Sequence, residues 1–246
     1  MGILIVYLCA AAYTLPLYIT HRRKIKEPKS YYRFAFFMGI LAAVFSVIFR
    51  YLLIDLGLWS DEVPPHTFMG GITVFLKILF EVALVEEFFK FLCGTIVLHT
   101  AVKKHPDLTE SGSMLIFAFV GLAFEILESF TSFRIIDGLF RGLTPLHFFF
   151  QLWMGKWWWK AHTAKEAGAR KNTVKFTFIA LSFPLLVHTL FDFLVNSFIT
   201  GLDPTGALED LIMWPAGILA WIAIIFILIT YIRAAKKDTA DLSEEK

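Results

Sequence analysis

Four glutamates occupy the middle of two strongly apolar stretches of the chain, Glu86 and Glu87 in the first, Glu125 and Glu128 in the second. An ionised side chain at the centre of a membrane helix costs roughly 2.5 to 3.5 kcal/mol, so four cost on the order of 10 kcal/mol. Lys90 follows on the helix face of the first pair. Neighbouring carboxylates in different environments can differ in protonation, and such a pair supplies the acid and the base of a hydrolytic reaction.

Two histidines extend this set of polar residues. His188 and Asp192 lie about 40° apart on one face of a later apolar stretch, and His147 lies near the start of another. Peptide hydrolysis needs a base to activate water, a donor or cation to hold the oxyanion, and an acid for the leaving amine. Carboxylates and imidazoles together supply all three.

A metal site is the alternative chemistry for the same residue types. Two histidines and a glutamate can hold zinc with a fourth position open to water. The histidines of such a set would be His147 and His188, and its three ligands would come from three separate stretches and lack the local HExxH spacing. The residues alone therefore leave open whether the site is zinc-assisted or consists of carboxylates only.

These side chains must be positioned by membrane-spanning helices. A run of about 20 apolar residues is long enough to cross about 30 Å of hydrocarbon as a helix. We predict seven such spans, at residues 2–20, 31–58, 72–101, 113–133, 145–159, 174–199 and 211–232. The predicted fold is an all-α polytopic transmembrane bundle. Since no internal repeat or long linker divides it, residues 1–232 are predicted to form one domain, followed by a cytoplasmic tail at 233–246.

Basic residues predict the orientation of the bundle. Fifteen Lys or Arg fall in the segments 21–29, 102–112, 160–175 and 233–237, against two in 59–71, 134–144 and 200–210. Because cytoplasmic connections carry the excess of positive charge, the N-terminus is predicted outside and the C-terminus in the cytoplasm.

This orientation places ionisable residues of four helices in one layer. At about 1.5 Å per residue, Glu86, Glu125, His147 and His188 lie roughly 18 to 21 Å above the cytoplasmic ends of their spans. If the helix faces converge, the side chains share one polar chamber slightly to the outer side of the membrane midplane.

Composition excludes several classes of protein. With 57% hydrophobic residues and a mean hydropathy of +0.66, the chain departs from soluble averages. A net charge of +2, with the basic residues lying between apolar spans, gives no face for nucleic-acid binding. Cys9 and Cys93 lie inside apolar runs without metal-ligand spacing, so no disulfide framework is predicted.

Taken in order, these motifs resemble those of a known family. Residues 86–90 read EEFFK, residues 124–128 read FEILE and residues 188–192 read HTLFD, while residues 141–155 combine an arginine with a histidine that opens a helix. The combination resembles the PrsW family of intramembrane proteases, in the wider clan of the type II CAAX prenyl endopeptidases. In those relatives the second motif ends in histidine and the last in asparagine. Glu128 and Asp192 stand at those positions here, which favours PrsW.

The resemblance implies cleavage of a single-pass membrane protein, of which an anti-sigma factor is the best-known type, toward its outer side in a prokaryotic plasma membrane. It implies that Glu86 and Glu87 activate water, and that Glu128, His147 and His188 complete the site as ligands or oxyanion donors. The implied supporting residues are Lys90, Glu125, Asp192 and Arg141.

Two other interpretations stay open at the sequence level. A layer of carboxylates and histidines also occurs in proton-coupled transporters and channels. Carriers often have paired halves with discontinuous spans, and no such repeat is detected here. A non-catalytic scaffold would require the whole polar layer to consist of structural ion pairs and helix-to-helix hydrogen bonds. The insertion cost of four glutamates disfavours that interpretation.

Overall fold

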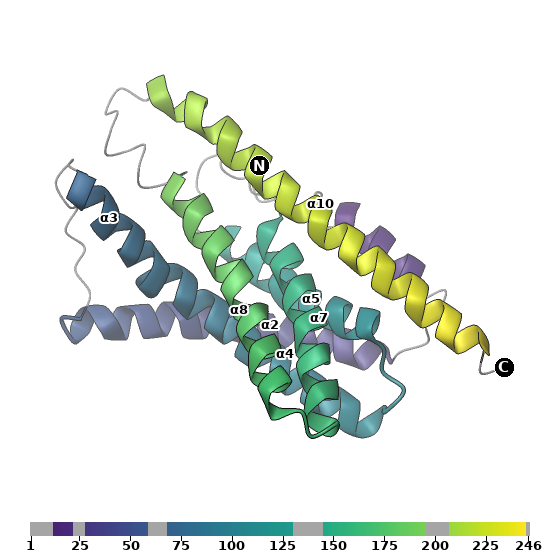
Figure 1. The fold of residues 1–246 in the computed structure, drawn as a ribbon. Coiled ribbons are helices and arrows are strands. Elements are labelled where there is room, and N and C mark those ends of the chain that lie inside the picture. The colour runs from purple at the N-terminus through teal and green to yellow at the C-terminus, as the bar shows by residue number, and fades with distance from the viewer. Residues whose placement is uncertain (1–11, 22–27, 59–67, 130–144, 195–206, 245–246) are drawn as a thin grey trace.

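The computed structural model describes residues 12–21, 28–58, 68–129, 145–194 and 207–244, and the secondary structure of these segments is helical without strands (Figure 1). The predicted all-α class is therefore confirmed. The elements are a helix at residues 12–21, α2 (Lys29–Asp55), α3 (Phe68–Lys77), the π-helical η1 (Ile78–Ala83), α4 (Leu84–Lys104), α5 (Glu110–Ser129), α7 (Leu146–Glu166), α8 (Arg170–Asp192) and α10 (Ala207–Glu244).

Among the described residues, four helical stretches are long and apolar enough to cross a membrane: Lys29–Asp55, Glu110–Ser129, Arg170–Asp192 and Pro215–Asp241. Their outer faces carry large exposed apolar side chains such as Phe37, Ile48 and Phe178. Such side chains are expected where a helix faces lipid and not water. The protein is therefore a multi-pass membrane protein, while the side on which each terminus lies stays a prediction.

The observed helices do not all begin and end where the predicted apolar runs do. The run predicted at 72–101 is not one α-helix, because η1 interrupts it between α3 and α4. The run predicted to end at residue 159 continues in α7 to Glu166, and α10 continues past residue 232 to Glu244. Hydropathy marks where a helix leaves the hydrocarbon, whereas the backbone hydrogen bonds that define the helix continue in water.

α5 and α7 form the centre of the bundle. Their side chains are mostly buried, including Met114 and Phe117 on α5 and Phe148 and Phe150 on α7. α2 and α4 pack on this centre from one side and α8 from another, while α10 runs diagonally along the outside (Figure 1). The two central helices thus have neighbours on most faces, and α7 is largely buried although it is not among the four helical stretches apolar enough to cross a membrane.

Close contact between α5 and α7 depends on glycine. A Cβ added at Gly121 would overlap the backbone carbonyl of His147 and lie 2.6 Å from Cγ of Gln151. At the other end of the interface, a Cβ at Gly155 would lie 2.6 Å from Cα of Met114. Small residues let membrane helices approach backbone to backbone, and here that approach sets the height of His147 against α5.

We expect Gly121→Ala to destabilise the protein by about 1 to 3 kcal/mol, because the added methyl group meets backbone that cannot move aside. Gly71→Ala in α3 is the matched control, since a Cβ there meets nothing within 4 Å. The control should be neutral or stabilising by roughly 0.5 to 1 kcal/mol. Unfolding of the two variants in mixed micelles measures the difference, and equal stabilities would contradict the proposed contact.

Candidate active site

Glu86 and Glu87 lie in the first turn of α4, directly after the π-helical η1. π-helical turns are rare and often occur at functional sites, because each inserts an extra residue into the helix and redirects the side chains that follow. Glu87 points into the bundle with 1% of its side chain exposed, whereas the Glu86 side chain is 18% exposed. The two adjacent acids therefore have different environments.

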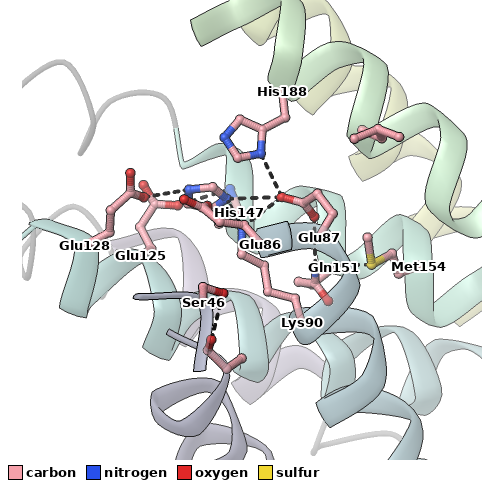
Figure 2. Close-up of polar contacts among 12 residues, drawn as sticks. Ser46, Glu86, Glu87, Lys90, Glu125, Glu128, His147, Gln151, Met154 and His188 are labelled. Atoms are coloured by element: carbon pink, nitrogen blue, oxygen red, sulfur yellow. Dashed lines mark hydrogen bonds and ion pairs between the residues drawn. The ribbon is translucent and has the colours of Figure 1, made fainter. Parts of the chain in front are cut away.

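Glu87 is the centre of the site, and donors from three other positions surround its carboxylate (Figure 2). Its Oε1 lies 2.8 Å from Nζ of Lys90 and 2.9 Å from Nδ1 of His188. Its Oε2 lies 3.4 Å from Nε2 of Gln151, and Nδ1 of His147 lies 3.7 Å from Oε1. Lys90, Gln151 and His188 donate to Glu87 from α4, α7 and α8, so the carboxylate links three helices.

Lys90 is completely buried, and its ammonium contacts two carboxylates and an imidazole of the site. Its Nζ lies 2.8 Å from Glu87 Oε1, 3.2 Å from Glu86 Oε2 and 2.8 Å from Nδ1 of His147. The same ammonium lies 3.8 Å from the ring centroid of Phe124, a cation–π contact. One buried positive charge thus contacts two carboxylates, so Lys90 is paired and both acids lie beside a cation.

His147 links the carboxylates of α5 to this centre. Because an ammonium only donates, Nδ1 of His147 accepts from Lys90, and Nε2 carries the ring proton that is donated to Glu128 Oε2 at 2.7 Å. The backbone N–H of His147 donates to Glu125 Oε2 at 3.1 Å. That N–H is one of the unpaired amides in the first turn of α7, so Glu125 caps the helix that carries the histidine.

His188 has the same arrangement as His147. Its Nδ1 faces the centre at Glu87, while its Nε2 lies 3.2 Å from Oδ2 of Asp192, one turn later on α8. The two imidazole rings are 5.0 Å apart, centroid to centroid, and nearly perpendicular. Each histidine therefore directs one nitrogen inward and holds the other on a carboxylate.

This arrangement fits a metal site. Glu86, Glu87, His147 and His188 each offer one ligand atom, and the four atoms lie within 4.8 Å of one another. Nitrogen and carboxylate ligands are those that zinc uses, and metal-binding histidines usually donate their second N–H to a carboxylate, as His147 does to Glu128, while Nε2 of His188 lies beside Asp192. Lys90 contacts three of the four residues, so its bond to His147 Nδ1 would have to give way to a metal.

The observed cluster shares its two histidines with the predicted ligand set but not its glutamate. Glu128 was predicted to join His147 and His188, but it lies on the outward nitrogen of His147, and Glu86 and Glu87 complete the cluster instead. The structure brings together eight predicted residues, which are Glu86, Glu87, Lys90, Glu125, Glu128, His147, His188 and Asp192. Arg141 lies outside the described residues.

Sequence interpretation missed Gln151. This residue is fully buried on α7, and its Nε2 contacts both Glu87 Oε2 and the sulfur of Met154. Its Oε1 is buried without a hydrogen-bond partner among the described residues. The available signal was its position four residues after His147, which puts both side chains on one helix face.

The fold and the site define a class of protein, a helical membrane protein with a buried centre of acids and imidazoles suited to hydrolysis. The model of the PrsW family, described as a family of intramembrane metalloproteases, matches residues 27–230. The chain therefore belongs to the PrsW family, a family of membrane proteases. No curated protein and no solved structure matches the chain.

Proposed function

We propose that the protein is an intramembrane endopeptidase in which Glu86 activates the attacking water. The observation that carries this proposal is the unequal exposure of the two adjacent acids. Glu87 accepts from Lys90, His188 and Gln151 and is nearly inaccessible, whereas the Glu86 side chain is 18% exposed. A general base must reach both water and the scissile carbonyl, and Glu86 is the carboxylate of the cluster that has room to do so.

The remaining residues of the site orient the catalytic groups and stabilise the charge that develops on the substrate. Lys90 supplies a fixed positive charge beside the base, and His188 and His147 supply N–H groups or lone pairs at the centre. A preorganised donor or cation near the oxyanion of the tetrahedral intermediate is typically worth a few kcal/mol in transition-state stabilisation. Glu128 accepts from the outer nitrogen of His147 and Asp192 forms an ion pair with that of His188, so each carboxylate helps to orient one ring.

Zinc is the cofactor that we propose for this cluster. Glu87, His147 and His188 would hold it, which leaves a fourth position for water and leaves Glu86 to act as the base. When bound, such an ion would polarise the scissile carbonyl and lower the pKa of a bound water. Independently of the metal, Glu87 and the two histidines bring α4, α7 and α8 to a common point. Buried helices around that point limit water to the few molecules that the reaction uses.

We expect purified protein to bind about one zinc ion per chain, and His147→Gln with His188→Gln to lose it, because the double variant removes both nitrogen ligands. His162→Gln, on the same helix as His147 but outside the cluster, is the control and should keep the metal. Elemental analysis measures the ion, and zinc should raise the melting temperature of the control only. Equal zinc in both variants would contradict the assignment.

A single-pass membrane protein of the anti-sigma-factor type, in a prokaryotic plasma membrane, is the substrate class that we propose. The support is the family of the chain together with the predicted orientation, which puts the site toward the outer side of the membrane. A transmembrane helix hides its peptide bonds within its own hydrogen bonds, so cleavage requires local unwinding as well as water.

Cleavage of a reporter helix in sealed vesicles tests this function. Purified protein should release the outer fragment of a single-pass reporter, and Glu86→Gln should not, with fragment masses identifying the scissile bond. The rival function is a proton-coupled transporter or channel. Proton flux without cleavage would establish that rival, and cleavage by Glu86→Gln at the normal rate would refute the role of Glu86.

A further inference from the structure

A cavity of about 550 Å³ lies between the helix at residues 12–21, α2 and α5. Its volume falls within the range of roughly 300 to 1,000 Å³ that is usual for ligand pockets. None of the residues that line it belongs to the cluster of acids and histidines on α4, α7 and α8. The cavity is therefore a separate candidate site.

Apolar side chains form most of the cavity wall. Leu15 comes from the first helix, Phe36 from α2, and Phe119, Leu122 and Ile126 from α5. These side chains offer a surface for hydrocarbon and no pattern of polar groups that would recognise a sugar, a nucleotide or a peptide backbone. An acyl chain is the membrane component that matches such a wall.

Two cations also line this cavity. Lys29 and Arg33 are one turn apart in the first two turns of α2, both are exposed, and both line the cavity. Neither forms an ion pair with any residue that the structure describes. Arginine and lysine side by side suit a phosphate, for which arginine offers a planar pair of donors.

A third observation comes from a buried hydroxyl. Thr14 lines the cavity with only 4% of its surface exposed, and its Oγ1 has no hydrogen-bond partner among the described residues. A buried polar group without a partner is costly, so such groups are usually satisfied by a molecule that belongs in the site. The cavity thus combines a mostly apolar wall, two cationic side chains and one hydroxyl without a hydrogen-bond partner among the described residues.

We propose that this cavity binds one anionic glycerophospholipid. The phosphate of this lipid lies between Lys29 and Arg33, and one of its acyl chains packs against Leu122. An ester carbonyl of the lipid accepts a hydrogen bond from the hydroxyl of Thr14. Lys29 belongs to the segment 21–29, which holds five Lys or Arg and is predicted to lie on the cytoplasmic side. Basic segments of this kind attract anionic lipid on the cytoplasmic side of a membrane.

Native mass spectrometry of the purified full chain, titrated with phosphatidylglycerol or with phosphatidylcholine of identical acyl chains, tests the proposal. Phosphatidylglycerol should bind more tightly, and the double variant Lys29→Gln with Arg33→Gln should weaken its binding roughly tenfold or more. The double variant Lys171→Gln with Lys175→Gln is the matched control, because it removes two exposed cations with the same spacing from α8. The control should bind as the parent protein does.

Thr14→Val tests the proposed hydrogen bond from Thr14 to the lipid, because valine keeps the shape of the side chain and lacks only the hydroxyl. We expect it to weaken phosphatidylglycerol binding a few fold. Equal binding of the two lipids, or unchanged binding after loss of both Lys29 and Arg33, would overturn the proposal. So would an effect of these variants on reporter cleavage with lipid binding unchanged, since the cavity would then contact the substrate.

Discussion

Replacing Glu86 by glutamine is expected to lower the rate of peptide cleavage by roughly 10² to 10⁴-fold, the usual contribution of a general base. Glutamine keeps the size of the side chain and an oxygen for Lys90 to contact, but it cannot accept a proton from water. Because the glutamate side chain is partly exposed and its hydrogen bond from Lys90 is 3.2 Å long, its loss should change the stability little. Fragment release from a reporter helix measures the rate.

Glu110→Gln is the control for this experiment, since Glu110 begins α5 outside the cluster. Its cleavage rate should equal that of the parent protein. The interpretation predicts a loss in kcat with little change in KM, because an interaction made in the transition state is removed. A raised KM at unchanged kcat would instead assign Glu86 to substrate binding.

Replacing Lys90 by methionine is expected to destabilise the protein by about 3 to 5 kcal/mol, the usual cost of leaving a buried charge unpaired. The reason is that Lys90 is fully buried between Glu86 and Glu87, so its loss leaves two carboxylates in the bundle without their cation. Unfolding by a denaturing detergent in mixed micelles measures the free energy.

Lys171→Met is the control, because Lys171 is exposed at the start of α8. It should stay within about 0.5 kcal/mol of the parent protein. Adding Glu87→Gln to Lys90→Met should recover part of the lost stability, since the substitution removes one of the two stranded charges. If Lys90→Met alone unfolds no more easily than the control, the ammonium is not required to balance the acids.

Several features of the site could be predicted because they depend on one helix at a time. The pair Glu86 and Lys90 follows from a spacing of four residues, as does the pair His188 and Asp192, and both are present at 3.2 Å. The motif order likewise indicated the PrsW family, which the family model confirms over residues 27–230. Helical periodicity fixes such neighbours whatever the rest of the chain does.

The helices themselves were also predictable, although their ends were less so. Runs of apolar residues indicate spans because a membrane excludes unpaired backbone groups. The same hydropathy did not predict η1, which interrupts the third span immediately before Glu86. It did not predict the full length of α10 either. Extra residues in a π-helical turn and helix outside the lipid leave no mark on local hydropathy.

Apolar runs and helical spacing were enough to identify the charged residues inside membrane spans and to show which of them lie on the same helix face. Only the tertiary structure decided that Glu87 meets His188, that Lys90 meets His147, and that Glu125 caps α7. Those contacts depend on how far each helix slides and rotates against its neighbours. Packing sets that register across the whole bundle, as in the close approach at Gly121, and no periodicity within a single helix specifies it.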